Sequence, residues 1–183
     1  MAAKKININV DNLCVYDPDF KSSAENFSSE SNLSGGSSAI HEVKTMDDLR
    51  DALNNYSQIK FLEFILHGSP GTIHFANGGA MVGSYLNTLC MNPQFLQKNA
   101  RILFDNCSIG EGTQGDTFMD SIGAGLFRGK GGTVGATTVT NWAFRFGGVY
   151  MQPLSFGRLK VKRYDESGNQ IGSQTVDRHG IKR

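Results

Sequence analysis

Two stretches of sequence decide the fold class of this chain: FLEFILHG at residues 61–68 and ARILFDNCSIG at residues 100–110. Each is a short apolar run followed by polar residues and glycine, which is typical of a buried strand in a parallel sheet. Open sheets of this kind bind ligands outside the carboxyl ends of their strands. His67 and Cys107 follow the two runs, so we expect them at one edge of the sheet, where they could form a thiol–imidazole dyad.

The rest of the chain fits a single α/β domain over residues 1–183. Thr45 can cap a helix, further helical patterns begin near Tyr85 and Thr113, and a strand is expected at residues 133–139. Strands and helices therefore alternate along most of the chain. This order predicts a three-layer α/β/α sandwich, in which helices cover both faces of a mainly parallel sheet.

Two segments depart from the alternation. Residues 17–39 are rich in Ser, Asn, Glu and Gly, which predicts a mobile loop. Residues 157–177 contain two alternating stretches around the turn DESGN, which predicts an antiparallel β-hairpin appended to the carboxyl-terminal side of the domain.

Composition limits the partners that we expect. The net charge is +1, so nothing predicts bulk attraction to nucleic acid or to a membrane surface. No apolar run approaches the length of a membrane span, and the first residues lack the long apolar stretch of a secretory signal. Three cysteines without metal-ligand spacing predict a free thiol, no metal site, and a cytoplasmic location or delivery into a reducing cytosol. The oligomeric state stays open.

The two motifs resemble those of the caspase-like (clan CD) cysteine peptidases, which include gingipains, clostripain, the CHAT peptidases and the self-processing domains of bacterial toxins. The resemblance rests on the FILHG and LFDNCSIG stretches, and TVGAT at residues 133–137 looks like the next core strand of that superfamily. It covers roughly residues 6–139. The Gln-Ala-Cys-x-Gly signature is absent, so the chain does not resemble a caspase proper.

The resemblance implies a cysteine endopeptidase that acts on protein or peptide substrates, either as a self-processing domain or as an effector domain of a longer bacterial protein. Cys107 would attack the peptide carbonyl, and His67 would protonate the departing amine. The backbone N–H groups of Gly68 and Cys107 would form the oxyanion hole, where a glycine avoids crowding the substrate.

Candidate substrate contacts follow the proposed nucleophile. Glu111 or Asp116 would suit a basic substrate residue, whereas Arg145 would suit an acidic one, and the sequence leaves both open. The resemblance also implies that Thr137, in the next expected strand, and Trp142, just beyond it, shape the pocket for the residue before the cleaved bond.

No cofactor is expected, but the resemblance suggests one activator. Toxin self-processing domains bind inositol hexakisphosphate on a basic surface near a β-flap. The expected hairpin carries four basic residues: Arg158, Lys160, Lys162 and Arg163. Alternating basic residues on a strand also serve to solubilise a sheet edge and to discourage aggregation.

Other interpretations remain open at this point. Cys107 could be a buried structural thiol, and His67 could be a strand-terminal histidine bonded to a carbonyl. The chain would then be a non-catalytic binding module of the same fold. A different α/β hydrolase or transferase could instead use Cys107 on acyl groups. We expect Cys14 and Cys90 in the core, and His41 and His74 on the surface.

Overall fold

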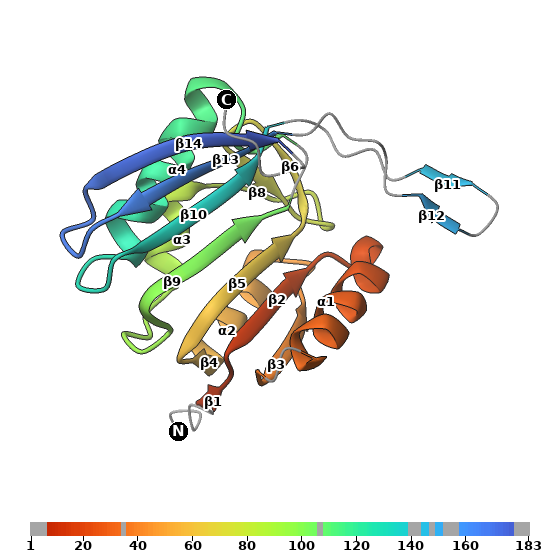
Figure 1. Cartoon of the computed structure of the whole chain (residues 1–183). Coiled ribbons are helices and arrows are strands. Elements are labelled where there is room, and N and C mark those ends of the chain that lie inside the picture. The colour runs from red at the N-terminus through yellow and green to blue at the C-terminus, as the bar shows by residue number, and fades with distance from the viewer. Residues whose placement is uncertain are drawn as a thin grey trace.

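The computed structural model describes residues 7–33, 36–105, 108–138, 144–146, 149–151 and 158–177, and it has a mixed α/β fold (Figure 1). Four α-helices lie within the described residues: α1 (Lys21–Leu33), α2 (Met46–Asn55), α3 (Gly83–Leu89) and α4 (Gly112–Leu126). In the described part of the chain, no helix combines the length and the apolar character needed to cross a membrane.

A mixed seven-stranded sheet forms the centre of the fold. Its strands, in spatial order, are β14 (Gln170–Asp177), β13 (Arg158–Tyr164), β10 (Gly132–Thr137), β9 (Leu96–Phe104), β5 (Ile59–Ile65), β2 (Asn12–Tyr16) and β3 (Ser38–Glu42). The strands from β10 to β3 pair in parallel, whereas β13 runs antiparallel to β10 and to β14. The hairpin expected at residues 157–177 is thus present, and it extends the main sheet instead of standing apart from it.

Smaller pairings surround the main sheet. The strands β6 (His67–Ser69), β7 (Thr72–His74) and β8 (Ala80–Val82) form an antiparallel three-stranded sheet. Two short pairs complete the set: β1 (Ile8–Asn9) with β4 (Tyr56–Ser57), and β11 (Phe144–Phe146) with β12 (Val149–Met151). The apolar run expected to reach His67 ends as a strand at Ile65, and His67 opens the small sheet.

Local signals account for the start of α2. Thr45 accepts a hydrogen bond from the Asp48 N–H, and the Asp48 carboxylate accepts one from the Thr45 N–H. This reciprocal capping box satisfies two donors that a helix start otherwise leaves without partners. Leu49, Ala52 and Leu53 then face the core, as their helical spacing predicts.

The prediction of a loop over residues 17–39 is wrong. Pro18–Phe20 forms a single 3-10 turn, α1 follows it, and β3 begins at Ser38. Composition predicted a loop because α1 carries mostly polar residues. Its few apolar residues suffice, because Ala24 and Phe27 lie three apart and pack into the protein on one side of the helix.

Alternate residues of β2 contribute to two buried clusters. Leu13 and Val15 join the large core, to which α2, α3 and α4 contribute. Cys14 and Tyr16 join a smaller cluster with Ala24, Phe27 and Ile65. Because side chains alternate along a strand, the two clusters lie on opposite faces of β2.

Candidate functional site

The backbone brings the ends of β5 and β9 together at the edge of the sheet. Phe64 of β5 and Phe104 of β9 are register partners, and the Asp105 N–H donates to the Phe64 carbonyl at 2.9 Å. His67 and Cys107 each come three residues after this matched pair. Cys107 and its neighbour Asn106 lie outside the described residues, so the site is built from the residues on either side.

The segment after Cys107 is held between two other elements of this edge. The Gly71 N–H, in the turn after β6, donates to the Ile109 carbonyl at 2.9 Å. The Gly110 N–H donates to the carbonyl of Thr137, the last residue of β10, at 2.8 Å. Ser108 is buried and has a φ of 46°, a left-handed conformation that is rare outside glycine. A sharp turn therefore follows residue 107, and it is bonded to the small sheet that His67 begins.

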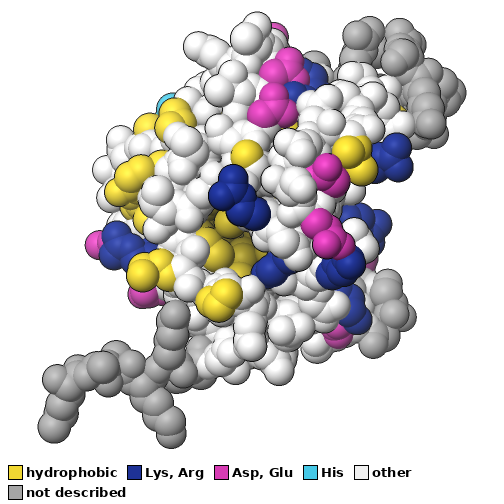
Figure 2. All heavy atoms as spheres, turned by 90° about the vertical axis from the view of Figure 1, so that its left-hand side faces the viewer, with side chains coloured by type: hydrophobic (Ala, Val, Ile, Leu, Met, Phe, Trp, Pro, Cys, Tyr) yellow, Lys and Arg dark blue, Asp and Glu magenta, His cyan; other side chains and the backbone are white. Residues whose placement is uncertain are grey.

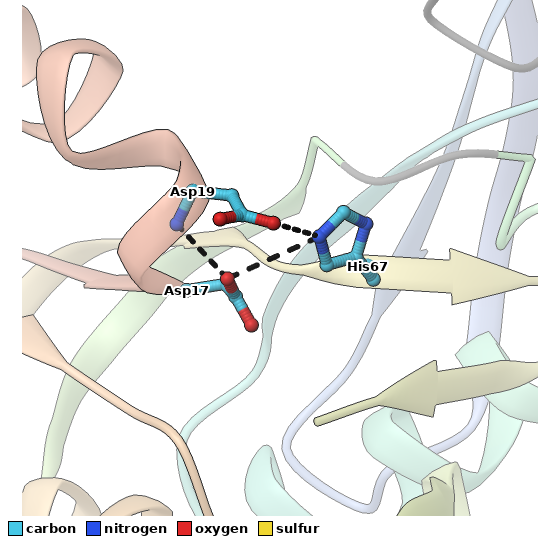
Figure 3. A group of neighbouring side chains, drawn as sticks. All are labelled: Asp17, Asp19 and His67. Carbon is cyan, nitrogen blue, oxygen red and sulfur yellow. Dashed lines mark hydrogen bonds and ion pairs between the residues drawn. The ribbon is translucent and has the colours of Figure 1, made fainter. Parts of the chain in front are cut away.

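Asp17 and Asp19 lie beside His67 (Figure 3). The His67 Nε2 lies 3.2 Å from Asp19 Oδ2 and 3.9 Å from Asp17 Oδ1. The ring of Phe20 also contacts the imidazole, with ring centroids 4.8 Å apart. The other ring nitrogen, Nδ1, points away from both carboxylates in Figure 3.

The position of Asp17 follows from the strand that precedes it. Asp17 comes directly after β2, and its N–H donates to the carbonyl of Ile65 at the end of β5. Its Oδ1 accepts a hydrogen bond from the Asp19 N–H, which caps the turn that leads into α1. The Asp17 side chain is 1% exposed, compared with 44% for His67 and 77% for Asp19. Among the described residues, its buried Oδ2 has no hydrogen-bond partner.

This arrangement fixes the orientation of the imidazole. A ring that donates its Nε2 proton to a carboxylate leaves Nδ1 as the nitrogen that can accept or donate a proton elsewhere. Asp17, Asp19 and His67 also present one ligand atom each, all within 4.8 Å of one another, so the same three residues could hold a divalent cation.

Gly68 and His74 complete the small sheet beside His67. Gly68 occupies the middle of β6 and pairs with Ile73, while His67 pairs with His74. His74 is half-buried, and its Nε2 lies 2.8 Å from the Ser69 hydroxyl. His41 is half-buried as well, and burial lowers the pKa of its imidazole. The prediction that these two histidines are surface residues is therefore only partly right.

The expected substrate contacts are spread over several elements. Glu111 is exposed at the N-cap of α4, and Thr137 ends β10 next to Gly110. Arg145 pairs with Tyr150 between β11 and β12, but only its backbone is described. Trp142 lies outside the described residues. The structure thus ties Thr137 and Glu111 to the segment after Cys107, since the Glu111 N–H donates to the Ser108 carbonyl.

Asp116 is engaged elsewhere, in an ionic network between α4 and β13. Its carboxylate contacts the Nζ atoms of Lys160 and Lys162 at 3.1 and 2.9 Å. Partial burial would raise the pKa of Asp116, but the hydrogen bonds from Lys162 and Lys160 outweigh it and lower that pKa. Lys162 is buried and also contacts Asp120, which accepts a hydrogen bond from Tyr164.

The ionic network bears on two earlier expectations. Asp116 pairs with Lys160 and Lys162 of β13, so these lysines would compete with a basic substrate residue for its carboxylate. Lys160 and Lys162 are neutralised by carboxylates of α4, which leaves the hairpin less suited to a polyphosphate than its sequence suggests.

A depression of about 330 Å³ lies at the opposite edge of the sheet. Its lining includes Leu96, where β9 begins, and Arg128 and Lys130, just before β10. Figure 2 looks onto this side of the molecule, where apolar side chains lie in a hollow beside basic ones. It lies at the amino ends of β9 and β10, whereas His67 follows the carboxyl end of β5, so the depression is separate from the site.

The two described cysteines are structural in position. Cys14 is fully buried, and burial raises the pKa of its thiol well above the ordinary value. Cys90 is half-buried, packs against the large core and has its Sγ 3.9 Å from the Leu53 carbonyl. Cys14 is therefore a core residue, as expected, and Cys90 lies at the margin of the core.

Asp17 and Asp19 were missed by reasoning from the sequence. Asp17 follows an apolar strand just as His67 does, so the rule on strand ends that singled out His67 applies to it equally. Residues 17–39 were interpreted as a loop, so Asp17 was not considered as a residue at the end of a strand.

Comparison with known proteins gives a family and little beyond it. The sequence has no significant match among curated proteins. It does match the profile of a family described as "Domain of unknown function (DUF4347)" over residues 39–166. This region runs from β3 to the turn after β13 and contains His67 and Cys107, while Asp17 and Asp19 precede it. Since the match covers well over half of the 183 residues, the chain belongs to the DUF4347 family.

Proposed function

We propose that this chain is a caspase-like (clan CD) cysteine endopeptidase that uses His67 and Cys107 as its catalytic dyad. One observation carries the proposal. Phe64 and Phe104 pair in register on adjacent parallel strands, and His67 and Cys107 follow them at the same spacing. The chain therefore leaves both strands at the edge where open parallel sheets bind their ligands, and we assign the dyad to that edge.

The architecture supports the same assignment. We propose a three-layer α/β/α arrangement with a mainly parallel sheet, as in that superfamily. Ala24 and Phe27 of α1 pack against one face of β2, and the cluster to which α2, α3 and α4 contribute lies on its other face. The five strands from β10 to β3 are parallel to one another.

The proposed reaction proceeds in two steps. The Cys107 thiol gives its proton to His67 Nδ1, and the thiolate forms a bond to the carbonyl carbon of the substrate. As the carbon–nitrogen bond breaks, the imidazolium returns the proton to the departing amine. Water, deprotonated by the same imidazole, then cleaves the thioester to give the carboxylic acid and the free thiol.

Asp17 and Asp19 act through His67 in this proposal. Both carboxylates lie on the Nε2 side, so they hold the ring with Nδ1 turned away from them (Figure 3). Asp17 is the more rigid of the two, because it is buried and its backbone is bonded to Ile65. We assign it a positioning role like that of the carboxylate in a serine protease triad.

The oxyanion of the tetrahedral intermediate would be held by the backbone N–H groups of Gly68 and Cys107. Two hydrogen bonds support this placement: the Gly71 N–H donates to the Ile109 carbonyl and the Gly110 N–H to the Thr137 carbonyl. Both hold backbone that follows the dyad residues in the chain. Preorganised donors of this kind stabilise developing charge without reorganisation. The substrate is a protein or peptide, either part of the same longer protein or a separate target.

Covalent labelling tests the proposal. Peptide acyloxymethyl ketones with Arg, Lys, Asp or Leu before the reactive group should add one inhibitor mass to the intact protein, at Cys107. Cys107→Ala should abolish the adduct, and Cys14→Ala should keep it. If no probe of the panel labels the folded protein, the peptidase proposal is wrong and the non-catalytic binding module takes its place.

Treatment with a chelator distinguishes the dyad mechanism from a mechanism that depends on a metal ion bound near His67. The proposed reaction needs no metal, so labelling and cleavage should be unchanged in EDTA. Cleavage that is lost in EDTA and restored by added Zn²⁺ would show that Asp17, Asp19 and His67 hold a cation, and it would overturn the dyad mechanism.

A further inference from the structure

A pocket of about 360 Å³ lies between the small sheet and two helices. Three segments line it: residues 70–72 after β6, residues 82–84 at the start of α3, and one side of α4. Pockets of this size are large enough to receive a side chain or a small ligand.

The pocket adjoins the proposed site. Gly71 lines the pocket and donates its N–H to the Ile109 carbonyl, in the segment that follows Cys107. Gly71 comes three residues after Gly68, which corresponds to about 10 Å of extended chain. A substrate whose carbonyl sits at the Gly68 N–H would therefore reach the pocket within about three of its own residues.

The lining residues of the pocket favour an uncharged guest. Among the described residues, all lining side chains are uncharged. The α4 wall carries Thr113, Thr117 and Ser121 at intervals of one helical turn. The Thr117 hydroxyl donates to the Thr113 carbonyl at 3.0 Å, and that of Ser121 donates to the Thr117 carbonyl at 2.8 Å. These two hydroxyl protons are used within the helix, and no described lining side chain offers a charged guest a countercharge.

The walls are fixed by close backbone contacts. A Cβ on Gly71, whose φ is 72°, would lie 2.7 Å from the Gln114 carbonyl oxygen. A Cβ on Gly83 would lie 2.6 Å from the Phe118 carbonyl oxygen. Glycines at these two positions let the small sheet and α3 approach α4 closely, so the pocket is formed before a ligand arrives.

A second depression continues the first. It has a volume of about 290 Å³ and shares Thr72 and Val82 with the pocket. Its other lining residues include Met46, Met81 and Tyr85, and the described lining again lacks charge. Val82 is 52% exposed between the two depressions, so an extended peptide can cross it and enter both.

We propose that this pocket is a substrate subsite that takes one uncharged side chain within three residues of the cleaved bond. The inference rests on the proposed peptidase function and adds a substrate class to it: sequences that are uncharged at one position near the cleavage site. Charged residues at that position are disfavoured because none of the described lining side chains carries a charge that would pair with them.

Cleavage of a proteome-derived peptide library, read by mass spectrometry, tests the subsite. The wild-type protein should show a depletion of Asp, Glu, Lys and Arg at one position near the cleaved bond. Thr117→Arg should raise kcat/KM about tenfold for peptides with an acidic residue at that position. Thr117→Glu should raise kcat/KM by a similar factor for peptides with a basic residue there. Ser167→Arg adds the same charge at an exposed turn that does not line the pocket, so it should keep the wild-type profile.

The outcomes separate the subsite from the peptidase function. If the wild-type protein cleaves peptides but the two Thr117 variants leave the profile unchanged, the subsite is wrong while the peptidase stands. If the wild-type protein cleaves nothing and Cys107 stays unlabelled, the proposed function fails and the subsite fails with it. Thermal melting of each variant, compared with that of the wild-type protein, shows whether a changed profile reflects a folded protein.

Discussion

The rings of Phe64 and Phe104 stack face to face across β5 and β9, with centroids 4.7 Å apart and planes 6° from parallel. The ring of Phe118, from α4, lies at 82° to the Phe104 ring, with centroids 4.9 Å apart. This aromatic group lies directly beneath the strand ends that lead to His67 and Cys107. These ring contacts stabilise the register of the two strands and pack α4, the helix that follows the proposed nucleophile, against them.

Exchanging single cysteines should separate catalysis from packing. Cys107→Ala should abolish labelling and cleavage and leave the free energy of unfolding nearly unchanged. Cys14→Ala should keep labelling but lower the free energy of unfolding by roughly 1–3 kcal/mol, because it removes a fully buried side chain. Urea denaturation with intact-mass labelling measures both. Marked unfolding of Cys107→Ala would favour a structural thiol instead.

Removing the buried carboxylate should impair orientation of the imidazole. Asp17→Asn keeps an oxygen that can cap the turn before α1 but loses the charge beside His67. We expect kcat to fall at least tenfold with little change in KM, since a misoriented ring affects the chemical step. The pH profile of kcat should also shift.

Asp19→Asn provides the matched control for Asp17→Asn. Asp19 is largely exposed, so its loss should have the smaller effect. Equal effects of the two substitutions, or none from Asp17→Asn, would contradict the positioning role.

A side chain at residue 68 should block the oxyanion position. Gly68→Val should lower the rate of peptide cleavage by about 10²–10³, the loss typical of one oxyanion donor. Alkylation of Cys107 by iodoacetamide should persist, because that reaction needs no oxyanion hole. Full peptide turnover in this variant would remove Gly68 from the mechanism. Loss of both reactions, with a lower melting temperature, would assign Gly68 to the local fold.

Glu63 should make stability depend on pH. Burial, followed by the negative charge of Asp105, raises the pKa of Glu63 from its ordinary value of 4.5 to about 7. The folded state therefore holds this proton more tightly than the unfolded state. The resulting stabilisation is complete below about pH 4.5 and is lost as the pH rises through about 7.

Glu63→Gln should flatten this dependence. Between pH 5 and pH 8 the wild-type free energy of unfolding should fall by on the order of 1–3 kcal/mol more than that of the variant. Urea denaturation across this range measures the difference. Parallel curves for the two proteins would show that the Glu63 carboxyl is hydrated in the folded state.

Lys162 should contribute more to the free energy of unfolding than Lys160, which also lies on β13. Lys162→Ala would leave the Asp116 and Asp120 carboxylates without the cation that they share. We expect this loss to lower the free energy of unfolding by about 2 kcal/mol, because the carboxylates are 42% and 51% exposed and can be hydrated. Lys160→Ala, at a more exposed contact with Asp116, should lower it by about 1 kcal/mol. Comparable losses from the two substitutions would show that burial of Lys162 does not decide its contribution.

Signals that are local in sequence predicted their elements well. Thr45 and Asp48 lie three residues apart and cap α2 as a pair, and the two apolar runs became the neighbouring strands β5 and β9. The alternating residues on either side of the turn DESGN became the paired strands β13 and β14. In each case the decisive interaction lies within a few residues or follows a simple period.

Features that depend on distant contacts were not predictable in the same way. The polar helix α1 is stabilised by two apolar residues that meet β2 and β5, and its own sequence gives little sign of this. The placement of Asp17 beside His67 requires β2 and β5 to be neighbours, although 50 residues separate the two side chains. That adjacency is a property of the sheet order.

The parallel order of β2, β5 and β9 also determines when the proposed enzyme can become active. Parallel neighbours cannot form from a hairpin, so each pairing waits for a long crossover segment to fold. A nascent chain that has reached His67 still lacks β9, and a chain that has reached Cys107 still lacks β10, whose last residue holds Gly110. The proposed activity would thus stay latent during synthesis, because folding of the later strands completes the dyad.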